Sequence, residues 1–125
     1  MTMSTIGWIF SGLFAAFIVF ASAAPKFMGA EAATASFDQL GWPQKYLLFI
    51  AFLEVGLVAL YLFPATSLIA AVFLTGLLGG AMASQLRVDN PLFSHVLFSV
   101  YLGVFLWGGL WFRMPKLREL LSIQL

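Results

Sequence analysis

The chain has 125 residues, of which 62% are hydrophobic and only 9% are charged, and its mean hydropathy is +1.02. Because so few polar side chains cannot cover a soluble domain of this length, we expect an integral membrane protein. Six Lys and Arg balance five Asp and Glu without a basic run, which argues against nucleic acid as a partner. The lack of cysteine excludes disulfides, thiolate metal sites and thiol redox chemistry by this chain alone.

Four apolar runs approach the roughly 20 residues that span the hydrocarbon core of a bilayer. They cover residues 6–24, 45–63, 66–86 and 93–112. Backbone groups in lipid must pair internally, and none of the runs alternates as a strand would, so four helices are predicted. Because the second and third links are short, successive helices should be antiparallel neighbours. The predicted fold is all-α, an antiparallel four-helix transmembrane bundle that forms one domain over residues 1–125.

The first run has an alternative interpretation as a cleaved signal peptide, since Ala21-Ser22-Ala23 has the small-residue spacing of a cleavage site. No Lys or Arg precedes Lys26, however, and the run exceeds a usual signal-peptide core. The long link that follows, residues 25–43, carries Phe37 and Leu40 at helical spacing. It predicts a short interfacial helix, and an irregular loop covering the bundle is the alternative.

Four crossings place both termini on one face of the membrane, here called side A. The link 25–43 and the loop 87–92 then lie on the opposite face, side B. Each side carries three Lys or Arg, so the positive-inside rule gives almost no preference for either orientation. The cluster of Arg113, Lys116 and Arg118 just past the last run favours a cytoplasmic side A.

Glu54 is the only carboxylate within the four runs, about 13 Å from side B at a rise of 1.5 Å per residue. A carboxylate at this depth is costly unless it is protonated, paired or hydrated, which marks it as a candidate functional residue. We expect it to be protonated unless Lys26 or another cation reaches it. A structural carboxyl held by a hydroxyl is the alternative.

Several polar residues could surround Glu54. Thr75, Ser99 and Tyr101 fall at similar depth, and Tyr101, then Ser99, are the expected direct partners, with His95 or Lys26 connected through water. Towards side B the chain supplies Lys26, Gln85, Arg87, Asp89 and His95. Side A offers only a basic tail, which we expect to be exposed. This asymmetry predicts a pocket that opens to side B and narrows onto Glu54.

Small residues recur on the third run at Gly76, Gly80 and Ser84. This spacing typically lets two membrane helices pack closely, so we expect the glycines to lie against a neighbouring backbone. A single histidine and a single membrane carboxylate cannot supply a bis-histidine haem or a three-ligand metal site. No metal and no cofactor is therefore identified from these residues.

A set of short motifs runs along nearly the whole chain. They are Pro25-Lys26-Phe27, Leu40-Gly41-Trp42-Pro43, Phe52-Leu53-Glu54, Phe63-Pro64, Thr75-Gly76-Leu77-Leu78-Gly79-Gly80-Ala81, Leu86-Arg87, and a tail from Leu106-Trp107 to Leu117-Arg118. Together they resemble the DoxX-like family of small four-helix bacterial membrane proteins. The family name comes from a subunit associated with a thiosulfate:quinone oxidoreductase.

The resemblance implies a bacterial cytoplasmic membrane and an association with membrane redox complexes. It marks Lys26, Glu54 and Arg87 as family-typical positions. Relatives often carry His near the position of Gln85, so a proton-transfer role there is in doubt for this chain.

Three functions are compatible with this pattern. The leading one is an accessory subunit that supports a redox or quinone-linked partner, with a lipophilic pocket around Glu54 and a bound quinone as one occupant. The second is a small enzyme acting on an apolar substrate, with Glu54 as acid or base and Tyr101 or His95 as orienting residues. The third is a proton-coupled transporter similar to small multidrug exporters, although those carry their carboxylate in the first helix. The lipid bilayer, a redox partner or a second copy are the expected partners. The pocket candidates are Lys26, Thr75, Gln85, Arg87 and Ser99.

Overall fold

The structure, a computed structural model, describes residues 2–124, and in this part of the chain all regular structure is helical. Four helical segments are long and apolar enough to cross a membrane: Met3–Phe27, Gln44–Leu62, Ser67–Arg87 and Leu92–Arg113. The predicted all-α bundle of membrane-spanning helices is confirmed. The chain is a multi-pass membrane protein.

The first span consists of three pieces. They are α1 (Met3–Ala16), the π-helical turns η1 (Phe17–Ala23) and α2 (Ala24–Phe27). The wide turns precede Pro25, which has no N–H to donate to the carbonyl four residues earlier, so the hydrogen-bond pattern shifts there. The span therefore continues three residues beyond the expected end and carries Lys26 on its last turn.

The long link contains the expected helix, α3 (Glu31–Leu40), whose Phe37 and Leu40 are buried. Gly41 ends it at a φ of 80°, a left-handed conformation that favours glycine. Pro43 then leads into a single 3₁₀ turn, η2 (Gln44–Tyr46).

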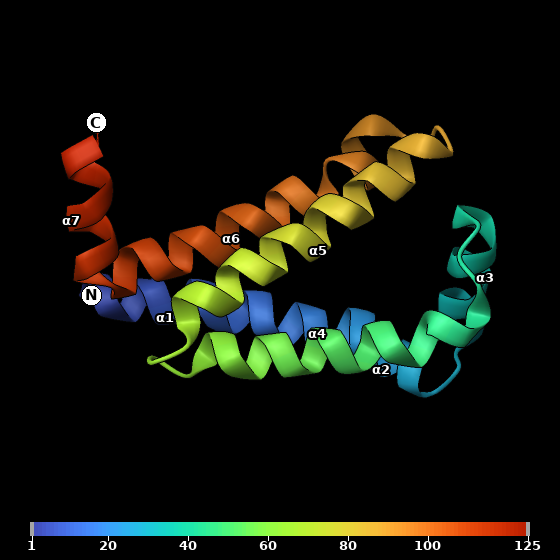
Figure 1. The fold of residues 1–125 in the computed structure, drawn as a ribbon, viewed down its shortest axis with the longest axis horizontal. Coiled ribbons are helices and arrows are strands. Elements are labelled where there is room, and N and C mark those ends of the chain that lie inside the picture. The colour runs from blue at the N-terminus through green and yellow to red at the C-terminus, as the bar shows by residue number, and fades with distance from the viewer. Residues whose placement is uncertain (1, 125) are drawn as a thin grey trace.

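The remaining elements alternate in direction. They are α4 (Leu47–Leu62), α5 (Ser67–Arg87), the π-helical turn η3 (Leu92–Val96), α6 (Phe98–Arg113) and α7 (Pro115–Gln124). The fourth span starts one residue earlier than expected and includes η3. The basic tail, which was expected to be exposed, forms a helix, and Figure 1 shows α7 turning away from the axis of α6.

The spans form a ring in which α1 packs on α6, α6 on α5, α5 on α4, and α4 on η1. Figure 1 shows the amino and carboxyl ends together at one end of the bundle, side A, while α3 and the α5–α6 connection lie at the other, side B. Helices α5 and α6 diverge from α1 and α4 towards side B. The bundle is thus closed at side A and splayed at side B.

The glycines that bring helices close together lie between α1 and α6, contrary to the expectation for the third run. A methyl group on Gly7 would lie 2.7 Å from the Gly109 carbonyl oxygen, and one on Gly109 would lie 2.9 Å from Tyr61 Oη. At Gly76 and Gly80 no heavy atom lies within 4 Å of such a methyl group. The predicted close packing of α5 through these two glycines is therefore wrong.

Candidate functional site

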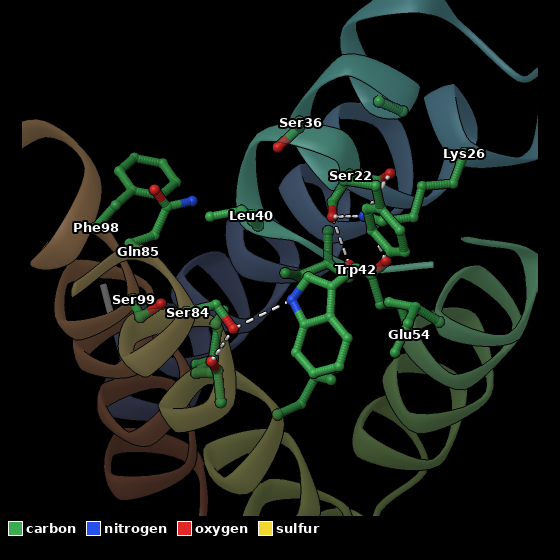
Figure 2. Close-up of a pocket in the computed structure, with 18 of the residues that line it drawn as sticks. Ser22, Lys26, Ser36, Leu40, Trp42, Glu54, Ser84, Gln85, Phe98 and Ser99 are labelled. Carbon is green, nitrogen blue, oxygen red and sulfur yellow. Dashed lines mark hydrogen bonds and ion pairs between the residues drawn. The ribbon is translucent and has the colours of Figure 1, made fainter. Parts of the chain in front are cut away.

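A cavity of about 880 Å³ occupies the splayed half of the bundle. Side chains of all four spans and of α3 line it, and most of them are apolar, including Ile18, Phe37, Leu74 and Leu102. We call it the side-B cavity. Figure 2 shows its polar groups divided between two walls, with Ser22, Lys26 and Glu54 on one and Ser84, Gln85 and Ser99 on the other.

The first wall carries a compact charged cluster. Glu54, on the third turn of α4, is only 4% exposed, and its Oε1 lies 2.9 Å from Lys26 Nζ. Its Oε2 accepts a hydrogen bond of 2.5 Å from Ser22 Oγ. Lys26 Nζ in turn donates to Ser22 Oγ at 2.8 Å and to the Ser22 carbonyl oxygen at 3.1 Å. The carboxylate and the ammonium group are therefore held in an ion pair by a shared hydroxyl.

The first span positions this cluster. Ser22 and Lys26 are four residues apart across the wide turns before Pro25, so both side chains face α4. The ring of Phe27 packs edge-on against Phe52, with centroids 4.9 Å apart, which joins the same two segments beyond the ion pair. The cation that reaches Glu54 is thus fixed in place by packing as well as by charge.

A second polar set closes the top of the cavity. Trp42 reaches from the α3–α4 link and donates from Nε1 to Ser84 Oγ on α5 at 3.2 Å, as Figure 2 shows. Gln85 accepts a hydrogen bond from Asn90, and Asn90 accepts one from Gln39 at 3.2 Å. Uncharged hydrogen bonds therefore connect α3 and its following link to α5 above the cavity.

The structure brings only some of the predicted residues together. Lys26 and Glu54 pair directly, so the expected water-mediated link is wrong and a cation does reach the carboxylate. Ser99, Gln85 and His95 line the same cavity, but the hydroxyl bonded to Glu54 belongs to Ser22.

Three predicted residues lie elsewhere. Tyr101 donates to the Phe93 carbonyl oxygen at 3.0 Å, so it is not the partner of Glu54. Thr75 accepts from Trp107 Nε1 at 2.8 Å and lines a separate groove between α5 and α6. Arg87 donates to the Leu40 carbonyl oxygen at 2.7 Å and so holds the end of α3 on α5. Depth alone placed Tyr101 and Thr75 beside Glu54, whereas their helical faces point away from it.

Sequence reasoning also missed a polar network at side A. Tyr61 and Ser11 are fully buried, 2.9 Å apart through their hydroxyl oxygens, and Tyr61 Oη donates to the Leu106 carbonyl oxygen at 2.6 Å. Arg113 Nη2 donates to the Tyr61 carbonyl oxygen at 2.8 Å, and its guanidinium lies 4.0 Å from the centroid of the Trp8 ring. Arg113 is thus a structural tie between spans and not part of an exposed tail.

The side-B cavity presents few charged or metal-ligating groups. Among the described residues, no three His, Asp or Glu side chains gather closely enough to hold a metal ion. The His95 ring, at the rim of the cavity, has its Nδ1 2.8 Å from Ser94 Oγ. A ligand would meet a long apolar surface, the Lys26–Glu54 pair, and several neutral donors and acceptors.

Comparison with known proteins gives a single family. No curated protein and no solved structure matches the chain significantly. The sequence model of the DoxX-like family matches residues 9–109, which includes Ser22, Lys26, Glu54 and both walls of the side-B cavity. With four-fifths of its length matched and four spans of membrane-crossing length, the chain belongs to the DoxX-like family.

Proposed function

We propose that this protein is an accessory membrane subunit that holds a lipophilic, quinone-type molecule for a redox partner. The ring of such a molecule would lie at the Lys26–Glu54 pair. The observation that carries the proposal is a buried ion pair in the wall of a largely apolar cavity. A quinone supplies reversible two-electron chemistry when bound, and this chain supplies the binding surface.

The composition of the cavity supports ligand binding. Small-molecule sites are concave and mostly apolar, with a few fixed polar groups, and they commonly measure about 300–1,000 Å³. The side-B cavity, at about 880 Å³, falls within this range. A buried ion pair contributes little net stability because desolvation offsets its attraction. Its place in the cavity wall favours a role in recognition.

The residues also fit a carbonyl- or hydroxyl-bearing ring. Lys26 Nζ lies on one wall of the cavity, and the Gln85 amide and the Ser99 hydroxyl lie on the other. A ring carbonyl could accept from Lys26 Nζ in place of the Ser22 carbonyl oxygen, and a second ring oxygen could bond to Gln85 or Ser99. The apolar lining suits an isoprenoid or alkyl tail.

The same contacts favour a binding subunit over an independent enzyme. A general base must be within reach of a substrate proton and oriented by its neighbours. Here the carboxylate is engaged by Lys26 and Ser22, and the proposed orienting residue Tyr101 bonds elsewhere. We assign the protein to the bacterial cytoplasmic membrane with side A in the cytoplasm, an orientation that Lys116 and Arg118 in α7 support.

Purification from the native membrane in mild detergent tests this proposal. We expect a stoichiometric partner that contains a redox cofactor, and a quinone in the organic extract. Glu54→Gln and Lys26→Met should lower the quinone content, whereas Glu31→Gln, the same carboxylate change at an exposed position on α3, should not. Quinone-free protein with no such partner, or catalytic turnover by the isolated chain, would refute the accessory role.

A further inference from the structure

We infer that the side-B cavity loads directly from the bilayer, through a gap between α4 and α5, and that it selects neutral over anionic lipophiles. This inference rests on the proposed function, because it concerns the route and the head group of the same ligand. It follows from where the cavity is open and from how its charges are balanced.

The gap begins where α5 stops packing against the bundle core. Ala71 and Leu74 are 0% and 1% exposed, and Leu74 forms the floor of the cavity. Further along α5, Gly76 and Gly80 line the cavity and are exposed. Figure 1 shows α4 and α5 close together at their connecting turn and diverging from there. Where these two helices diverge, the α5 side of the cavity is therefore lined by glycines that carry no side chain.

The glycines keep the gap open. No heavy atom lies within 4 Å of a methyl group placed on Gly76 or Gly80, so neither position is needed for helix contact. Both lie in the middle of the α5 span, where the surroundings in a membrane are hydrocarbon. A side chain at either position would project into the gap, whereas glycine leaves room for an apolar chain to pass.

On two other sides of the cavity, side-chain contacts connect the surrounding segments. On the side where the first span meets α6, the rings of Phe17 and Phe98 pack at a tilt of 53°, with centroids 5.1 Å apart. At the side-B end, the Trp42–Ser84 hydrogen bond crosses from the α3–α4 link to α5. The α4–α5 gap thus lies beneath this bridge and faces lipid.

The charges lining the cavity cancel. Lys26 and Glu54 are paired at 2.9 Å, and the polar groups on the opposite wall, Ser84, Gln85 and Ser99, are uncharged. A carboxylate or phosphate head would have to separate Lys26 from Glu54 and leave the latter charge buried, which is costly. A neutral head with carbonyl or hydroxyl groups can bond to the cluster without breaking the pair.

Photolabelling in lipid nanodiscs tests both parts. The probes are an azidoquinone with a ten-carbon tail and a photoactivatable fatty acid of matching tail length, each dissolved in phosphatidylcholine. Labelling is quantified by intact-mass spectrometry and located by peptide mapping. The variants are Gly76→Leu and Gly80→Leu, with Gly79→Leu as the matched control, since Gly79 has equally open space but faces the α5–α6 groove.

We expect saturable azidoquinone labelling of cavity residues in the wild type and in Gly79→Leu. After probe addition, Gly76→Leu and Gly80→Leu should approach saturation at least about tenfold more slowly than the wild type, because the leucine narrows the gap through which the probe enters. Their melting temperatures should match the parent, which separates blockage from misfolding.

Each contrary result has its own meaning. Equal rates of labelling for the wild type and Gly80→Leu would refute the gap while leaving the proposed quinone site intact. Stronger saturation by the fatty acid than by the quinone would refute the selection of neutral heads. Failure of the wild type to show saturable labelling with either probe would overturn the ligand-binding function itself, and this inference with it.

Discussion

Removing the cation from the Lys26–Glu54 pair should expose how the cluster is stabilised. Lys26→Met keeps most of the apolar stem of the lysine but leaves the Glu54 carboxylate, 4% exposed, with Ser22 as its remaining partner. Breaking a buried ion pair by removing one partner costs about 3–5 kcal/mol. Because the 2.5 Å hydrogen bond from Ser22 persists, we expect the lower end, a loss of about 3 kcal/mol in the free energy of unfolding.

A double-mutant cycle isolates the pair. Glu54→Gln alone should cost less, about 1 kcal/mol, because Lys26 lies on the last turn of its span and can extend its charge towards side B. In Lys26→Met/Glu54→Gln no unpaired charge remains, so stability should return to within about 1 kcal/mol of the wild type. The four proteins are compared by reversible unfolding in mixed detergent micelles. Additive losses, or a Lys26→Met variant as stable as the parent, would show that the pair is not a coupled unit.

Two further predictions concern the closed end of the bundle, and a third concerns the order of the spans. Gly109→Ala should lower the free energy of unfolding by about 2 kcal/mol through overpacking, because the new methyl group would lie 2.9 Å from Tyr61 Oη. Gly79→Ala, which places its methyl group in open space, should not lower it. Thermal unfolding in detergent compares the two variants. Tyr61→Phe should cost about 1–3 kcal/mol in the same assay, because a buried carbonyl of α6 and the Ser11 hydroxyl both lose their partner. Reporter fusions at the carboxyl terminus and after Ala33 should respond oppositely, and identical responses would contradict the four-span topology.

The sequence predicted the fold because its decisive signals are local. Run length and the lack of strand alternation identify membrane helices without tertiary information, and short links fix the direction of their neighbours. The residues at which the helical segments end were less predictable. The wide turns before Pro25 extend the first span to Phe27, and they depend on a hydrogen-bond shift that run length does not reveal. The helical character of Pro115–Gln124 was missed because the segment was interpreted from its charge alone.

The site was partly predictable, for reasons that differ between residues. Glu54 stands out from its depth alone, whereas Lys26 was expected to be connected to it through water and in fact pairs with it directly. Ser22 was considered only as part of a cleavage-site pattern, although its position four residues before Lys26 is a usable signal for a shared helical face. Tyr101 was misplaced because depth gives the level of a residue in the membrane but not the direction in which its side chain points.

Glycine spacing shows the same difference between what a sequence pattern indicates and what the side chains contact. The repeat in α5 correctly indicates that Gly76 and Gly80 share a face, yet that face borders a cavity and not another helix. The glycines that do permit close approach, Gly7 and Gly109, lie on different spans, so no repeat within one helix reveals them. Periodicity identifies a face, and only the fold determines what the face meets.

The two ends of the bundle depend on each other physically. An open cavity forfeits the dispersion contacts that packed side chains would make, so the helices around it need support from elsewhere. At side A, Tyr61 bonds to α1 through Ser11 and to α6 through the Leu106 carbonyl, while Arg113 returns from α6 to the end of α4. These bonds fix the separation and direction of the spans where they are closest. Helices α4 and α5, held at their connecting turn, can then diverge towards side B without collapsing onto the space between them. The buried network at side A therefore supports a bundle in which glycine, rather than a packing side chain, occupies the middle of α5.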